Sequence, residues 1–236
     1  MLHHSALNTI QFSEALIKLW EEGILLQSIW ETVYITLLST AIAYLIGLPL
    51  GILIHYTSKD GIHPIPWLNK TLSVFVNVLR SIPFIILMVA LVPFAKTIIG
   101  KSYGNGVLIV TLIIAAFPYV ARMVESSVKE VDRGIIEAAQ SMGASDIKII
   151  LKVLLPEAKP SLITGAVIST VTVLGYSAMA ATIAAGGLGM LAITYGHQRY
   201  NDDVIWICVF LTIILVVTIQ ELGMLVARKT DKRIKK

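Results

Sequence analysis

Long uncharged stretches alternate with short charged segments along this chain of 236 residues. A bilayer core of about 30 Å requires about 20 apolar residues in a helix. Five stretches reach or approach that length, and they are expected to be helices because backbone groups in lipid must bond to one another. The predicted spans cover about residues 30–56, 71–98, 103–121, 161–185 and 204–227. The pattern therefore predicts an all-α integral membrane protein with five transmembrane helices.

Composition supports the membrane interpretation. Hydrophobic residues make up 56% of the chain and charged residues 14%, with a mean hydropathy of +0.80. A soluble domain carries about 25% charged residues, so these values exclude a soluble enzyme and a disordered chain. The single cysteine, Cys208, can close no disulfide within the chain, which excludes a disulfide scaffold.

The positions of the basic residues predict the orientation. Five spans place the two termini on opposite sides, and cytoplasmic segments of membrane proteins carry an excess of Lys and Arg. With the C-terminus inside, fourteen of the nineteen basic residues lie in cytoplasmic segments and four lie outside. We therefore predict the N-terminus outside and the C-terminus inside. The basic tail, residues 228–236, then matches anionic lipid and not nucleic acid.

The N-terminal segment, residues 1–27, lacks the basic start and the apolar run of a cleavable signal peptide. Phe12, Leu16, Leu19 and Trp20 share one side and predict an interfacial helix over residues 12–26. The chain is thus divided into this segment, a membrane domain over residues 28–227 and the basic tail.

Residues 122–160 form the one large loop that is predicted to face water. Residues 134–142 suit a short helix, and Gly143 supplies the positive φ that a tight helix end favours. Ser145 or Asp146 can cap a second helix. We interpret the loop as a cytoplasmic hairpin of two helices, although a surface linker that only joins two spans fits the same pattern.

The second helix of this hairpin carries Ile147, Ile150, Leu151 and Leu154 on one side. Pro156 and Pro160 are expected to end it before the fourth span, because proline lacks the N–H that a helix interior uses.

No residue set for catalysis or cofactor binding is found. Ala95–Ser102 partly matches a phosphate-binding loop, and Gly187–Ala192 partly matches a dinucleotide-binding turn, but neither lies between a strand and a helix as those sites require. The five histidines show no metal-ligand spacing. The chain is therefore not expected to be an enzyme or to hold a metal or cofactor.

Two intramembrane features are candidates for the transport pathway. Arg80 shares a helix face with Ser73 and Asn77, and a charge there should face a partner, a cavity or the lipid headgroups. The stretch 175–187 contains nine Gly, Ala or Ser residues among thirteen, which allows close helix packing at an interface, in a gate or within an ordinary core. The candidate pathway or gate residues are Arg80, Tyr176, Ser177 and Met179.

A motif in the loop resembles a known family. Glu137-Ala138-Ala139, then Gly143 after three residues, then Val153-Leu154-Leu155-Pro156 after nine more, resembles the signature of permease subunits of ATP-binding cassette (ABC) importers. Further segments are similar to the methionine-import permeases of that family, over about residues 29–225; these segments are Trp30–Thr32, Gly47–Gly51, Arg80–Leu87, Ala121–Glu125, Gly175–Met179 and Gly186–Gly189.

The resemblance implies a transport function. The chain would be the permease subunit of a type I ABC importer for methionine, with D-methionine as a further implied substrate, in the bacterial cytoplasmic (inner) membrane. It would work as a homodimer with two ATPase subunits, which hold ATP and Mg, and with a periplasmic or lipoprotein methionine-binding protein. Alternatives are a permease for another amino acid, a phosphonate or an osmolyte, or a secondary transporter.

The resemblance also implies a contact site for the ATPase. The short helix near residues 137–145 would be a coupling helix that lies in a groove of the ATPase, with Glu137 facing a basic residue there. The implied coupling residues are Glu137, Ala138, Ala139, Met142, Gly143, Ala144 and Pro156.

Overall fold

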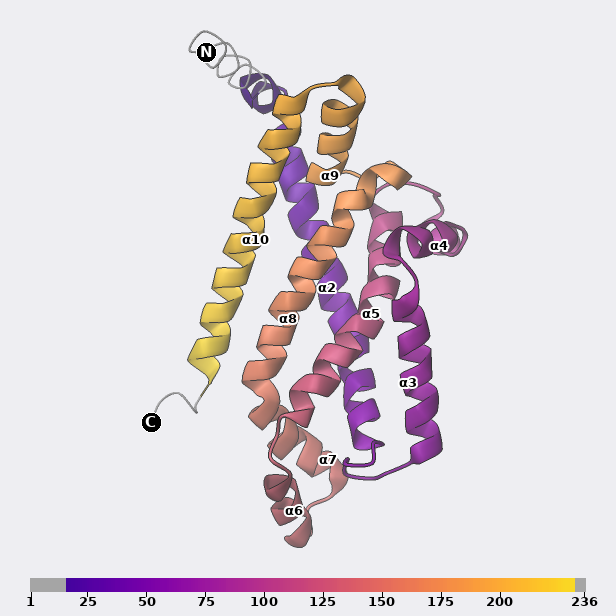
Figure 1. The fold of residues 1–236 in the computed structure, drawn as a ribbon, viewed down its shortest axis with the longest axis vertical. Coiled ribbons are helices and arrows are strands. Elements are labelled where there is room, and N and C mark those ends of the chain that lie inside the picture. Colours follow the sequence, from indigo (N-terminus) through magenta and orange to yellow (C-terminus); the bar gives the residue numbers. More distant parts are fainter. Residues whose placement is uncertain (1–15, 232–236) are drawn as a thin grey trace. The chain divides into compact units, whose positions relative to one another are not determined.

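The computed structural model describes residues 16–231, and every regular element in that range is a helix (Figure 1). The described residues divide into two compact units. The first unit contains residues up to 39, 84–112 and 172–218, and the second contains residues 40–83, 113–171 and 219 onward. Several long helices contribute residues to both units, and each unit is described separately below.

Four helical stretches are long and apolar enough to cross a membrane by themselves; they are α2 (Ile24–Tyr56), α5 (Asn105–Lys129), the stretch Asp146–Ile183 and α10 (Asp202–Thr230). Each contains most of one predicted span. They confirm four of the expected spans as continuous helices, with ends that differ by several residues. The described chain therefore has the all-helical membrane architecture that the hydrophobic pattern predicted.

The fifth expected span, residues 71–98, is not one straight helix. It consists of α3 (Pro66–Ser81) and α4 (Phe84–Ile99), which are bent by 103° where they meet. Ile82 has an extended backbone, φ −84° and ψ 125°, because the ring of the following Pro83 disfavours the helical conformation there. Pro83 alone did not indicate this break, because prolines also lie inside α2, α4 and α5.

The expectation that Pro156 and Pro160 end the second hairpin helix is wrong. The short helix α7 (Asp146–Ile149) continues through a π-helical turn, Ile150–Leu154, into α8 (Leu155–Ser177), which includes both prolines. A π turn is wider than an α turn and accommodates local disruption of the hydrogen-bond ladder. We attribute the passage of Pro156 to this wider turn directly before it.

The helix α5 extends to Lys129, eight residues past the predicted end of the third span at 121. Arg122 and Glu125 therefore lie on a membrane helix and not in the water-facing loop. After α5, the first hairpin helix is α6 (Arg133–Ser141). The hairpin is thus shorter than the predicted loop, and it begins one turn beyond the end of α5.

The chain after α8 is irregular. A 3-10 helix, Ala178–Ile183, is followed by Ala184 in the left-handed conformation and by the Gly186–Gly187 turn, so the helical path ends two residues before the predicted end of the fourth span at 185. The short helix α9 (Leu188–Leu191), a π turn (Ala192–Gly196) and a 3-10 turn (His197–Arg199) lead to α10.

The core of the first unit joins the residues around the start of α2 to α9 and to the first turns of α10. Leu19 and Leu25 pack with Leu188, Leu191 and residues near the start of α10. Residues 16–21 are helical, but the helix predicted over residues 12–26 is interrupted at Glu22 and Gly23, and residues 24–26 belong to α2. Its residues 12–15 lie outside the described range.

The second unit is built around a close contact between α2 and α5. Ile54 of α2 and Ala121 of α5 are fully buried together with Val76 of α3. A Cβ atom on Gly47 would lie 2.7 Å from Val120, and one on Gly51 would lie 2.7 Å from Val124. Two glycines spaced by four residues let helix backbones approach closely. This contact explains the Gly47–Gly51 segment that the sequence analysis singled out.

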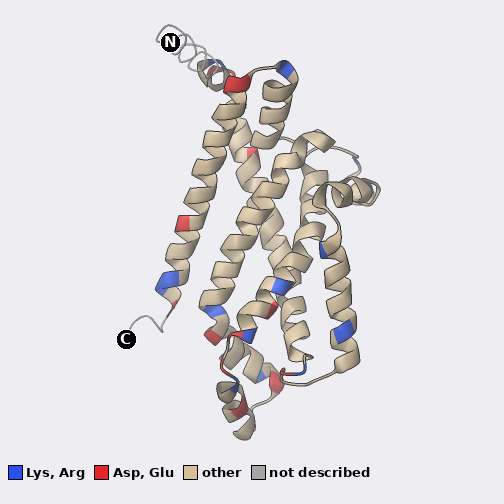
Figure 2. Cartoon of the chain, viewed as in Figure 1, with Lys and Arg blue, Asp and Glu red and all other residues tan. Residues whose placement is uncertain are grey.

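Charged residues are distributed unevenly along the described chain. Figure 2 shows long helices that are mostly uncharged, and a concentration of Asp, Glu, Lys and Arg around α6 and α7. The hairpin therefore presents a charged surface within the second unit.

Candidate functional site

The helix α6 has defined ends, which the local sequence explains. Asp132 caps its start by accepting a hydrogen bond from the backbone N–H of Gly134 at 2.6 Å. At its end, Gly143 has a φ of +76°, and the N–H of Ala144 donates to the carbonyl of Ala139 at 3.1 Å. This is the helix end that glycine favours. The predicted positive φ at Gly143 is confirmed.

The two faces of α6 differ. Ile136 and Ala139 are buried against the rest of the second unit. Glu137, Ala138 and Met142 are exposed, and the Met142 side chain is 81% accessible. The exposed face of α6 therefore combines a carboxylate with a large apolar side chain. Of the other predicted coupling residues, Gly143 and Pro156 are exposed and Ala144 is half-buried.

Glu137 has a partner within the chain. The Nε of Arg133 donates to its carboxylate at 2.9 Å, and a second nitrogen of Arg133 lies 3.5 Å from a carboxylate oxygen of Asp60. These side chains are all more than half exposed, and such surface pairs contribute about 0–1 kcal/mol. The weak pairing leaves the Glu137 carboxylate available to a cation on another protein.

The hairpin is bonded to the end of α2. The hydroxyl of Tyr56, the last residue of α2, donates to a carboxylate oxygen of Asp146 at 2.7 Å. The ring of Tyr56 also stacks on His63, with centroids 6.0 Å apart. Sequence reasoning missed this contact because Tyr56 and Asp146 are 90 positions apart, and Asp146 was considered only as a helix cap.

The polar face of α3 contacts α5. Arg122 donates to the carbonyl of Ser73 at 3.2 Å and to the side chain of Asn77 at 3.0 Å, and it also bonds to Glu125 one turn along its own helix. Arg80 lies with its guanidinium 5.8 Å from the ring centroid of Tyr119. Arg80 is itself exposed. The stripe of polar residues on α3 is therefore partly used for packing within the second unit.

The other candidate pathway residues lie in the first unit. Tyr176 stacks on Phe84, with ring centroids 4.7 Å apart and planes at 10°. The Ser177 hydroxyl donates to the carbonyl of Leu174 at 2.7 Å, so it stabilises its own helix end. Met179 lies half-buried in the 3-10 helix that follows.

A polar network in the first unit was not anticipated. The side chain of Asn105 donates to Glu31 at 3.2 Å and to Tyr34 at 2.8 Å, and it accepts a hydrogen bond from the N–H of Gly186 at 2.6 Å. Thr32 accepts another from the N–H of Leu188 at 2.9 Å. The network fixes the Gly186–Gly187 turn to α2 and α5, and it accounts for the glycines because a Cβ on Gly186 would overlap the Glu31 carboxylate.

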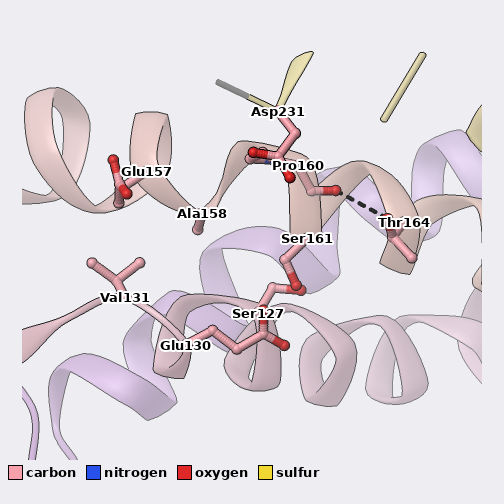
Figure 3. A pocket seen from close by; sticks show the side chains of 9 residues that line it. All are labelled: Ser127, Glu130, Val131, Glu157, Ala158, Pro160, Ser161, Thr164 and Asp231. Carbon is pink, nitrogen blue, oxygen red and sulfur yellow. Dashed lines mark hydrogen bonds between the residues drawn. The ribbon is translucent and has the colours of Figure 1, made fainter. Parts of the chain in front are cut away.

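The second unit also contains an acidic pocket of about 350 Å³ (Figure 3). Its carboxylates are Glu130, Glu157 and Asp231, and the Thr164 hydroxyl on its wall donates to the carbonyl of Pro160 at 3.1 Å. Within residues 16–231, no group of three or more His, Cys, Asp or Glu side chains has the arrangement of a metal site. We assign no chemistry to this pocket.

Comparison with known proteins places the chain in a family. The family profile described as "Binding-protein-dependent transport system inner membrane component" matches residues 47–236. The probable D-methionine transport system permease protein MetI of Vibrio cholerae is 44% identical over 89% of this chain and 93% of its own length. The methionine import system permease protein MetP of Bacillus subtilis is 40% identical over 77% of this chain and 82% of its own length.

Solved structures agree with the sequence matches. One described as inward-facing conformations of the MetNI methionine ABC transporter has a TM-score of 0.87 and 42% identity, covering 90% of this chain and 98% of that chain. An amino acid ABC transporter solved with histidines has a TM-score of 0.74 at 21% identity, which shows the same fold. The chain thus belongs to the family of inner-membrane components of binding-protein-dependent transport systems, among its MetI-like permeases.

Proposed function

We propose that this chain is the membrane-spanning subunit of an ATP-driven methionine importer, with D-methionine as a further substrate, in the cytoplasmic membrane of a bacterium. The observation that supports this most strongly is the combined 42% identity and TM-score of 0.87 to a chain of the MetNI methionine transporter. Relatives named as methionine permeases support the same substrate.

Energy for transport would enter through contact with separate ATPase subunits, which would bind ATP and Mg. The exposed face of α6, with Glu137, Ala138 and Met142, is the proposed docking surface, supported by its apolar and acidic character. A capped helix on a hydrogen-bonded hairpin moves as a rigid element and can transmit a displacement. Two copies of this chain, each with one hairpin, would form the pathway between them.

The pathway itself would use residues of α3 and of the segment after α8. We propose that Arg80, exposed at the last turn of α3, faces the pathway, and that Met179 seals its outer end. Tyr176 and Ser177 would hold the sealing segment, supported by the stacking of Tyr176 on Phe84 and the bond from Ser177 to Leu174.

Reconstitution tests the proposal. The chain is purified with its ATPase subunit, placed in liposomes and supplied with its binding protein, and uptake of labelled L-methionine and D-methionine is measured with and without ATP. Methionine uptake that requires ATP and the ATPase is expected. Uptake of only another amino acid, a phosphonate or an osmolyte would replace methionine as the substrate. Accumulation by the chain alone would instead support a secondary transporter.

The orientation is tested by labelling. Cys208 is 2% exposed, so a cysteine introduced at Met142 is the accessible thiol among the described residues. In sealed inside-out vesicles a membrane-impermeant maleimide is expected to label Met142→Cys, whereas in right-side-out vesicles it is not. The reverse result would place the hairpin outside the cell and overturn the docking assignment.

A further inference from the structure

We propose that Tyr56 is a positioning residue for energy coupling: through its hydrogen bond to Asp146 it makes the hairpin and the end of α2 move together. This inference rests on the proposed function, in which the hairpin receives the movement of an ATPase. It adds a residue outside the family motif, on a different helix, to the machinery of transport.

The bond is the direct link from α2 to the second helix of the hairpin. Asp146 is the first residue of α7, directly after the turn at Gly143 and Ala144 that ends α6. The Tyr56 hydroxyl donates to its carboxylate at 2.7 Å. A hydrogen bond to a charged acceptor is about twice as strong as one between neutral groups, so this link is well suited to carry a displacement of the hairpin.

The end of α2 that receives the bond is itself rigid. The side chain of Asn69 on α3 donates to the carbonyl of Ile54 at 2.6 Å, and the N–H of His63 donates to the carbonyl of Tyr56 at 3.0 Å. Gly61 lies so close to the carbonyl of His55 that a Cβ there would overlap it. The corner formed by residues 54–69 is therefore held by several independent bonds.

The same end of α2 continues into the close contact with α5. One turn before Tyr56, Gly51 packs against Ala121 and Val124. A movement of α2 at this point must displace α5 as well, since close-packed interiors do not deform continuously. The second unit thus contains an unbroken series of contacts from α7 through Tyr56 to α2 and α5, which is the kind of network that carries coupling.

The second contact between the hairpin and this corner is weaker. Arg133 lies 3.5 Å from Asp60, and both side chains are more than 60% exposed to solvent. An exposed pair at that distance constrains position little. Removing the Tyr56 hydroxyl would therefore leave the hairpin folded, because its own caps remain, but would loosen its link to α2.

The test uses the whole complex in liposomes, with its ATPase and binding protein, and measures methionine imported per ATP hydrolysed. Tyr56→Phe and Asp146→Ala are expected to lower this ratio about threefold or more, while ATP hydrolysis and co-purification of the ATPase persist. Asp146→Asn keeps an acceptor oxygen but not its charge, and its ratio is expected to lie between those of the wild type and of Asp146→Ala.

Tyr44→Phe is the matched control. Tyr44 lies on the same helix, and its hydroxyl donates at 2.8 Å to the carbonyl of Leu162, a residue of α8 and not of α6 or α7. The Tyr44→Phe variant loses a comparable hydrogen bond within the same unit. Its stability should therefore fall as much as that of Tyr56→Phe, while its ratio of methionine imported to ATP hydrolysed stays unchanged. An equal ratio in Tyr56→Phe and Tyr44→Phe would reduce Tyr56 to a structural role and overturn the inference.

A second readout separates this inference from the proposed function. If the wild-type complex imports no methionine, the proposed substrate is wrong. The role of Tyr56 is then tested by hydrogen–deuterium exchange of the backbone amides with and without ATP. ATP is expected to change the protection of residues 57–65 in the wild type and in Tyr44→Phe but not in Tyr56→Phe. The same response in all three would refute the role of Tyr56.

Discussion

Gly51 of α2 lies directly against Ala121 of α5, so closely that a Cβ atom on Gly51 would overlap the Ala121 carbonyl oxygen. The overlap is with backbone, which cannot move aside by changing a rotamer. The nearest side-chain atom, the Cβ of Val124, would be 2.7 Å away. This contact between two helices sets how closely the second unit can pack.

We expect Gly51→Leu to lower the free energy of unfolding by about 1–3 kcal/mol, the usual cost of overpacking a well-packed site. Thermal unfolding of the purified chain in detergent, followed by size-exclusion chromatography, measures the change. Gly165→Ala is the control, because a Cβ there would lie 3.6 Å from Met123, an ordinary contact distance. If both variants unfold at the wild-type temperature, the α2–α5 contact is not as described.

Gly143→Val is expected to disrupt the end of α6. The φ of +76° places this residue in the left-handed region, which costs about 1–2 kcal/mol for a residue with a Cβ. Loss of ATPase co-purification and of transport, with normal membrane insertion, is the expected result. Gly143→Asn should be milder since asparagine tolerates this conformation better. Wild-type transport in Gly143→Val would contradict the requirement for this helix end.

Glu137→Lys is expected to separate docking from stability. The carboxylate takes part only in exposed pairing with Arg133, worth about 0.3–0.5 kcal/mol for residues four apart in a helix. The melting temperature should therefore change little, while the reversed charge repels a basic residue on the ATPase and reduces co-purification. Arg133→Gln breaks the same pair without altering Glu137 and should keep the ATPase bound. Equal co-purification of the ATPase with the wild type, Glu137→Lys and Arg133→Gln would argue against Glu137 as a docking residue.

A substitution at Gly186 tests the polar network of the first unit. The Cβ of Gly186→Ala would overlap the Glu31 carboxylate, which is held in place by Gln27 and Asn105. We expect the variant to be destabilised, because moving Glu31 breaks those bonds, each worth about 0.5–1.5 kcal/mol. In a Glu31→Ala background the same change should cost much less, since the overlap no longer exists. Additive effects in the double-mutant cycle would show that the two sites do not interact.

The sequence alone was sufficient for features that depend on neighbouring residues. Apolar stretches of about the bilayer thickness predicted the long helices, and Gly143 predicted the left-handed end of α6, because both properties arise from hydrophobic length and from local backbone geometry. The turn at Gly186 and Gly187 likewise follows from local backbone geometry, because adjacent glycines disfavour a helix.

The tertiary structure decided what depends on residues far apart in the chain. The helix breaks at Pro83 but continues through Pro156, because a π turn precedes only Pro156. The contacts between Tyr56 and Asp146 and between Gly51 and Ala121 join segments dozens of residues apart. A helical period shows which residues share a face, but only the packed helices determine which face each one meets.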